Sequence, residues 1–467
     1  MLTYFPKYFS TRAIIAYFVT LALVSVLFMN RVLPLQFVLF GVVAVVTFFV
    51  FSNKLTMAWE RYSVRMFPKK LFLAALLIRL VYVIFIYFYY ISETGAPYAY
   101  YSADEQFYQE AAGVWYQYGF EEFVGYMRAY AEYSDSGYCW WLALLYLPFG
   151  PYVLVGRIVK CVVDAFTCVL LYNIGKRNFG EAAGRIGGVF YMLMPNAWLY
   201  CGVTLKEIEM AFMIVLFVER GDLALRSPKL KLQDLLLPLL IIGVMLTFRT
   251  AMAAVLAAAM VAALILTSKK QLQLWKKILF TTLFGLWMLA TTGVELLQEA
   301  QTLWEGRAEN QSVGYQYRSE REGGNNLAKY ATASVFAPLI FTIPFSTMVE
   351  VQGQENQMMM NGANFIKNIL SGLTILALFL LLKRGDWRKH VLPIAVMCGY
   401  LVVLVFSNFA HSERFHFPAL ALELMFAAFG VTQLTNKHKR WYVIWLVGMS
   451  VANIAWALIK LKGRGLA

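Results

Sequence analysis

The side chains best suited to chemistry lie in an acidic stretch, residues 93–138. Eight carboxylates occur there against a single base, Arg128. Four of its residues share one helical face, at positions i, i+4, i+7 and i+11: Asp104, Tyr108, Ala111 and Trp115. This spacing predicts an amphipathic helix that lies along a membrane surface.

Asp104 is the carboxylate of this stretch that could act as a base. Ser102 and Glu105 match a capping box, in which Glu105 reaches back to the helix start and so has a structural role. That arrangement leaves the Asp104 carboxylate available to take a proton from an acceptor hydroxyl. The alternative is that Asp104 only interacts favourably with the helix dipole.

Three cations elsewhere could hold an anionic group. Arg249 interrupts the apolar stretch 233–267, where a charge is costly and is usually functional or paired. A guanidinium there can bind a phosphate with two hydrogen bonds, although it could also extend to the membrane interface. Lys206 precedes Glu207 in a short loop, and Arg414 lies between two apolar runs. Together with Asp104, these residues predict a site for an anionic lipid headgroup.

A late polar stretch, residues 296–333, mixes further cations with tyrosines. It contains Arg307, Arg318, Arg321, Lys329, Tyr315 and Tyr317. Arg318, Arg321, Tyr315 and Tyr317 are candidate contacts for a sugar or phosphate, although this composition is unspecific. Arg79, within an apolar run, is expected to pair with a carboxylate such as Asp164.

The elements that must position these residues are apolar helices. The runs lie at about 13–29, 34–51, 71–92, 139–173, 186–200, 208–219, 233–248, 250–267, 277–295, 364–382, 391–409, 416–434 and 441–460. Helices satisfy every backbone polar group internally, as a bilayer requires. The sequence predicts an all-α polytopic membrane protein with about 11–13 transmembrane helices.

The basic loops indicate the orientation of these helices. Lys and Arg gather in loops around 53–70, 176–185, 220–231, 269–277, 383–389 and 437–440. Positively charged loops usually face the cytoplasm, so 93–138 and 296–333 are expected to lie outside. The hairpin 233–267 then has its tip at Arg249 facing outward, and 334–349 is expected to be re-entrant or interfacial. The C-terminal tail is expected outside, despite its charge.

Composition limits the class of protein. Hydrophobic residues make up 60% of the chain and charged residues only 15%, unlike a soluble globular domain. The net charge of +14 is explained by cytoplasmic loops, and no nucleic-acid partner is expected. Five scattered cysteines and four dispersed histidines predict buried thiols and argue against a zinc site. The chain divides into an N-terminal transmembrane hairpin, 1–52, and a membrane domain, 53–467, with outer loops 93–138 and 296–363.

Several motifs, in order, resemble the bacterial GT-C glycosyltransferases, which include protein O-mannosyltransferases and the lipid A aminoarabinose transferase. The sequences that carry the resemblance are Asp104-Glu-Gln-Phe-Tyr-Gln-Glu-Ala-Ala112, Leu147-Pro-Phe-Gly-Pro-Tyr-Val-Leu-Val-Gly-Arg157, Tyr172-Asn-Ile-Gly-Lys-Arg-Asn-Phe-Gly180, Met194-Pro-Asn-Ala-Trp-Leu-Tyr-Cys-Gly-Val-Thr-Leu-Lys-Glu207, Leu246-Thr-Phe-Arg249 and Glu413-Arg-Phe-His-Phe-Pro418. The resemblance covers about 71–434. The chain departs from the family at Ser136–Trp141, where a proline-rich stretch is replaced, and in its extra N-terminal hairpin.

The resemblance implies an enzyme that transfers a sugar, with inversion, from a polyprenyl-phosphate donor at the outer face of a bacterial inner membrane. Asp104 takes the position of the catalytic base, with Glu105 and Glu207 as acidic partners. Lys206, Arg249 and Arg414 would hold the donor phosphate as it leaves. Some members use a divalent cation and others do not, and the acceptor can be a glycan, a lipid or a protein.

Two other functions fit the same sequence. One is an O-antigen polymerase or ligase, in which the late stretch carries the chemistry. The other is a transporter of lipid-linked sugars without catalysis. The residues do not distinguish the sugar, the acceptor or the oligomeric state.

Overall fold

The computed structural model describes residues 2–131, 133–226, 232–267, 282–283, 307–320 and 324–466. Within these ranges the chain is built from helices and contains no strand, and only Val32 and Val349 form an isolated bridge. The predicted helical class is therefore confirmed. Apart from residues 282–283, the predicted helix at 277–295 falls outside the described residues, as does Arg321.

Among the described residues, six helices are long and apolar enough to cross a membrane. They are α1 (Lys7–Leu27), α2 (Leu35–Ala58, continued to Arg61), α3 (Phe67–Thr94), α17 (Asn361–Arg384), α19 (Glu413–Thr432) and α20 (His438–Lys462). Two shorter apolar helices, α12 (Thr250–Leu266) and α18 (Val391–Val405), accompany them, as does the apolar part of α11 (Leu232–Phe248). The chain is thus suited to several membrane crossings, as its sequence predicts.

Three helices that pack around α19 carry more charge. They are α7 (Val153–Phe179), α8 (Glu181–Leu193) and α10 (Glu207–Arg226), and the uncharged α9 (Pro195–Cys201) packs against α3 and α7. α19 is buried along nearly all of its length, so it forms the centre of the bundle. The predicted pair is present: Arg79 of α3 binds Asp164 of α7, and both side chains are fully buried. Four of the five cysteines are buried, and Cys398 is partly exposed.

Several of the basic loops lie together at one end of the bundle. Arg185 donates hydrogen bonds to the carbonyls of Trp59 and Tyr62, which joins α8 to the loop before α3. Arg226 similarly bonds to the carbonyl of Lys389 and to the side chain of Asn178. These loops therefore lie at the same end of the bundle. That this end lies on the cytoplasmic side of a membrane stays a prediction.

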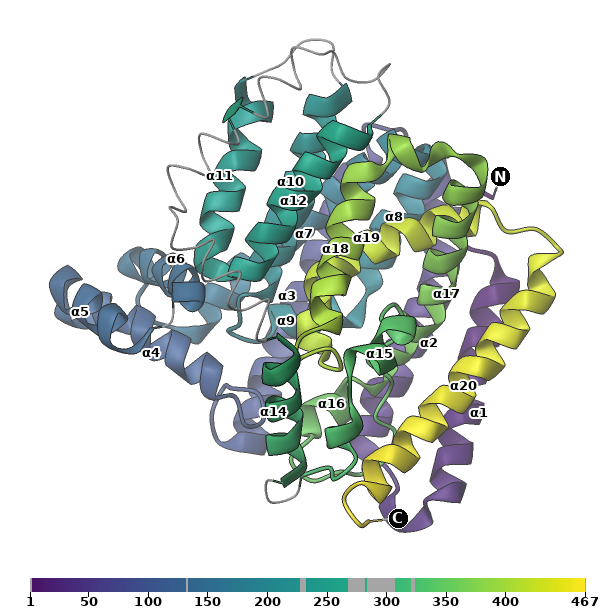
Figure 1. Ribbon diagram of the computed structural model, residues 1–467, viewed down its shortest axis with the longest axis horizontal. Helices are drawn as coiled ribbons and strands as arrows, with labels where there is room; N and C mark the ends of the chain where they lie inside the picture. Colours follow the sequence, from purple (N-terminus) through teal and green to yellow (C-terminus); the bar gives the residue numbers. More distant parts are fainter. Residues whose placement is uncertain are drawn as a thin grey trace.

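The opposite end of the bundle, named the site end here, holds α4 (Ala103–Tyr118), α5 (Phe120–Tyr130), α6 (Tyr133–Phe149) and α14 (Arg307–Glu320) (Figure 1). The two chain termini lie at opposite ends of the bundle in the same view. Gly119 separates α4 from α5 with φ +96°, a conformation that side chains with a Cβ rarely adopt. The hairpin of α11 and α12 turns at Arg249, where the sequence predicts its tip.

The segment that the sequence predicts to be re-entrant or interfacial consists of short turns and irregular backbone. That segment, 334–349, contains most of α15 (Ala333–Phe336), a short turn at Ala337–Leu339 and irregular residues, which continue to 354 before α16 (Glu355–Met359). Irregular backbone away from water needs internal partners. Lys367 donates to the carbonyl of Ile343 at 2.6 Å, and Asn368 donates to that of Pro344 at 2.9 Å. The segment is therefore held by side chains of α17 and is not a regular membrane-spanning helix.

Candidate functional site

Asp104 lies in the first turn of α4, at the site end. Its side chain is 55% exposed, and one of its carboxylate oxygens accepts a hydrogen bond from Arg414, the second residue of α19. These two residues are 310 positions apart in the sequence. The structure therefore brings together the predicted base and one of the predicted phosphate-binding cations.

Glu207 joins Arg414 to a second predicted cation. Its Oε1 accepts a hydrogen bond from Nε of Arg414 at 2.6 Å and lies 3.9 Å from a guanidinium nitrogen of Arg249. The Glu207 side chain is completely buried, so its charge has to be balanced by these cations. Arg249 also donates to the hydroxyl of Tyr400 at 3.1 Å. Glu207 thus holds two guanidinium groups at one point.

Asp104, Glu207, Arg249 and Arg414 form one half of a charged cluster, and Lys206 with its partners forms the other half. Its ammonium donates to the carbonyl of Phe248 at 2.6 Å and to the carboxylate of Asp135, which also accepts from the hydroxyl of Tyr108 at 2.9 Å. Burial lowers the pKa of Lys206, and the neighbouring Asp135 opposes that shift. Burial also raises the pKa of Tyr108, as does Asp135. The cluster therefore contains three cations and three acids.

Glu105 is buried and does not cap its helix. Ser102 makes no capping hydrogen bond, so the predicted capping box is wrong. Instead, the Glu105 carboxylate accepts hydrogen bonds from the backbone of Ala99 at 2.9 Å, from the backbone of Thr204 and from Arg157 at 3.1 Å. A fully buried guanidinium requires an anion, and this requirement outweighs a cap worth about 1 kcal/mol. Glu105 therefore fixes the loop that leads to Lys206.

A cavity of about 230 Å³ opens beside these groups. It is lined by Asp104 and Arg414, by Tyr100 and Tyr101 before α4, and by Leu199, Tyr200, Val203 and Leu205 around the end of α9. Asn356 and Met360 close another side. The cavity thus has a charged wall and an aromatic and apolar wall, a combination that suits a ligand with both a charged and an apolar part.

Helix α14, in the late polar stretch 296–333, contacts the site through the loop that leads to Arg414. Gln311 and Arg318 of α14 donate to carbonyls in the loop 405–408, and the hydroxyl of Tyr315 lies 3.3 Å from Nδ1 of His411. This loop leads directly to Arg414. Tyr317 of the same helix is 68% exposed, and its predicted contact with a sugar or phosphate stays a prediction.

Aromatic rings continue this connection. Phe409 stacks on Phe415 with ring centres 4.0 Å apart, and Arg249 lies over Phe415 at 4.3 Å. Such cation–π contacts hold a guanidinium in place. The late stretch therefore supports the site through the loop that it binds.

The site contains residues that the sequence reasoning missed. Asp135 pairs with Lys206, and Arg157 pairs with Glu105. Lys160 donates to the carbonyl of Val203 at 2.8 Å. Arg157 and Lys160 stand in an apolar run, where a charge is a functional signal, whereas nothing distinguishes Asp135 from neighbouring acids. Among the described residues, no three His, Cys, Asp or Glu side chains are grouped as metal ligands.

Comparison with known proteins finds no family model, curated protein or solved structure that matches this chain.

Proposed function

We propose that the protein transfers a sugar from a polyprenyl-phosphate donor to an acceptor hydroxyl, with inversion. The observation that carries the proposal is the convergence of Asp104, Lys206, Arg249 and Arg414 from four separate segments. The resemblance assigns these residues to the base and to the phosphate. A site for an anionic leaving group beside a partly exposed carboxylate suits this reaction.

The charge balance of the cluster suggests how a donor would bind. Arg414 is shared between Asp104 and the buried Glu207, and Glu207 cannot be solvated elsewhere. A phosphate that approaches Arg414 would therefore displace the exposed carboxylate first. Displacement releases Asp104 at the moment when the donor is seated, so that it is available to accept a proton.

In the reaction, the acceptor oxygen forms a bond to the anomeric carbon from the face opposite the phosphate. The bond between that carbon and the phosphate oxygen breaks, and its electron pair leaves with the polyprenyl phosphate. The proton of the acceptor hydroxyl passes to Asp104. Arg414, Lys206 and Arg249 stabilise the charge that develops on the leaving phosphate.

Mass spectrometry of cells lacking the protein tests this proposal. We expect a polyprenyl-phosphate sugar to accumulate and one glycan, lipid or protein modification to disappear. Wild-type protein and the Glu110→Gln variant, which changes an exposed acid of the same helix, should restore the modification. Asp104→Asn should not. Unchanged lipid-linked sugars and modifications would contradict the proposal.

A polymerase or ligase is the second candidate, because α14 binds the loop that leads to Arg414. In that case Arg318→Ala would abolish product formation while Asp104→Asn retains it. If the protein is instead a transporter, purified protein in vesicles would move the lipid-linked sugar across the bilayer without any covalent product.

A further inference from the structure

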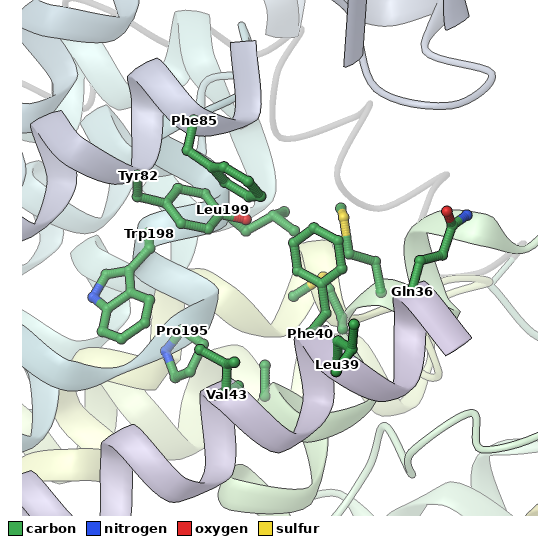
Figure 2. A pocket seen from close by; sticks show the side chains of 13 residues that line it. Gln36, Leu39, Phe40, Val43, Tyr82, Phe85, Pro195, Trp198 and Leu199 are labelled. Atoms are coloured by element: carbon green, nitrogen blue, oxygen red, sulfur yellow. The ribbon is translucent and has the colours of Figure 1, made fainter. Parts of the chain in front are cut away.

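An apolar groove of about 390 Å³ adjoins the site. Figure 2 shows side chains of α2, including Leu39, Phe40 and Val43, facing Phe85 of α3 and Trp198 of α9. Leu199 and Met360 line both this groove and the cavity beside Asp104 and Arg414. The groove and the charged cavity are therefore neighbours that share a wall.

The N-terminal hairpin is firmly attached where it borders the groove. Tyr17 donates to the side chain of Asn361 at 2.7 Å, and Asn361 donates to the carbonyl of Phe37 at 2.8 Å. Gly41 of α2 crosses Gly362 of α17 so closely that a Cβ added to Gly362 would lie 2.5 Å from a carbonyl oxygen. Close crossings at small residues are typical of packed membrane helices. The position of the α2 wall is thus fixed.

We infer that the N-terminal hairpin forms one wall of a binding groove for the hydrocarbon chain of the lipid-phosphate substrate. This inference rests on the proposed function for the identity of that lipid. A single molecule with a phosphate at Arg414 and a chain between α2, α3 and α9 would fill both neighbouring spaces. The hairpin that departs from the family pattern then acts in substrate binding.

The exposure of the lining residues supports a lipid occupant. Leu39, Val43 and Phe85 are 56%, 59% and 52% exposed, which in a membrane means contact with lipid. A chain can therefore enter sideways from the bilayer. The lining side chains are mostly aliphatic or aromatic, and Gln36 is the one amide among them, so the groove offers little to a polar ligand. Burial of each methylene contributes roughly a factor of four in affinity.

Photolabelling with farnesyl phosphate that carries a diazirine at the end of its chain tests the inference. The probe should label α2 and α9 peptides of the purified full-length protein, and unlabelled farnesyl phosphate should compete. In Val43→Trp the indole occupies space for about two methylenes, so labelling of these peptides should fall on the order of tenfold. Val81→Trp is the matched control, because Val81 of α3 is similarly exposed (61%) but does not line the groove. It should label like the wild type.

Three results would overturn the inference: label only on peptides that do not line the groove, an equal loss in both variants, or equal labelling by a diazirine phosphatidylcholine that farnesyl phosphate does not displace. The last result would mean that ordinary bilayer lipid fills the groove. Labelling of the groove in a protein that transfers no sugar would refute the proposed function and leave the groove assignment standing. Normal sugar transfer by Val43→Trp together with unchanged labelling would refute the groove assignment and leave the proposed function standing.

Discussion

Asp104 and Glu105 are adjacent carboxylates that should differ sharply in what they contribute to stability. The side chains of Glu105 and its partner Arg157 are both fully excluded from solvent, whereas that of Asp104 is 55% exposed. Removing one partner of a buried ion pair costs about 3–5 kcal/mol, because the other charge stays buried without compensation. Removing one partner of an exposed pair costs roughly 0–1 kcal/mol. Glu105→Ala should therefore destabilise the protein far more than Asp104→Ala.

The free energy of unfolding in mixed micelles, measured by titration with a denaturing detergent, checks this ordering. Glu105→Ala combined with Arg157→Leu is the control, since it removes both charges and should recover part of the lost stability. Sugar transfer by Asp104→Ala should be lost in a protein of nearly normal stability. Equal destabilisation by the two single variants, or a cost below about 1 kcal/mol for Glu105→Ala, would refute the assignment of Glu105 as a buried clamp.

Three further predictions concern the site and its support. Arg414→Gln should lower kcat/KM for the lipid-phosphate donor by about 10²–10³, as measured in initial-rate assays, because a phosphate ligand is lost; an unchanged value would contradict the assignment. Asp164→Ala should cost about 3–5 kcal/mol in unfolding experiments, because Arg79 would stay charged and buried, and the cost should shrink when Arg79 is replaced by leucine. Burial lowers the pKa of His411 to about 3, so the unfolded chain binds a proton more readily below about pH 6.5 and stability should fall as the pH drops from there towards 3. His411→Gln should reduce this loss in unfolding measurements between pH 7 and 4.5; an identical pH dependence would show that other groups cause it.

The sequence predicts those features that depend on a single charge within an apolar run. Arg79 needs a buried acid and finds Asp164, and Arg249 stands at a helix turn as expected. Glu105 was assigned to the wrong partner, because a capping box is a local pattern and cannot reveal that Arg157 lies nearby in space. Asp135 was missed for the same reason, since its partner Lys206 is 71 positions away. Long-range pairs of this kind are determined by helix packing.

The groove could not be predicted from the sequence either. Its wall combines Phe40 of the N-terminal hairpin with Phe85 and Trp198, which belong to separate apolar runs. The sequence predicts each run to be an apolar helix, and only the packing of these helices against one another creates a concave surface. The sequence treats the hairpin as an addition to the membrane domain, whereas in the structure it lines the groove that adjoins the site.

Product analysis with purified protein tests the central claim most directly. The protein would be incubated with a polyprenyl-phosphate sugar and the acceptor identified from cells that lack it, and the rate and anomeric configuration of the product would be measured. We predict a product of inverted configuration and a rate that falls by about 10²–10⁴ in Asp104→Asn but not in Glu110→Gln. Retention of configuration, or an undiminished rate in Asp104→Asn, would contradict the account.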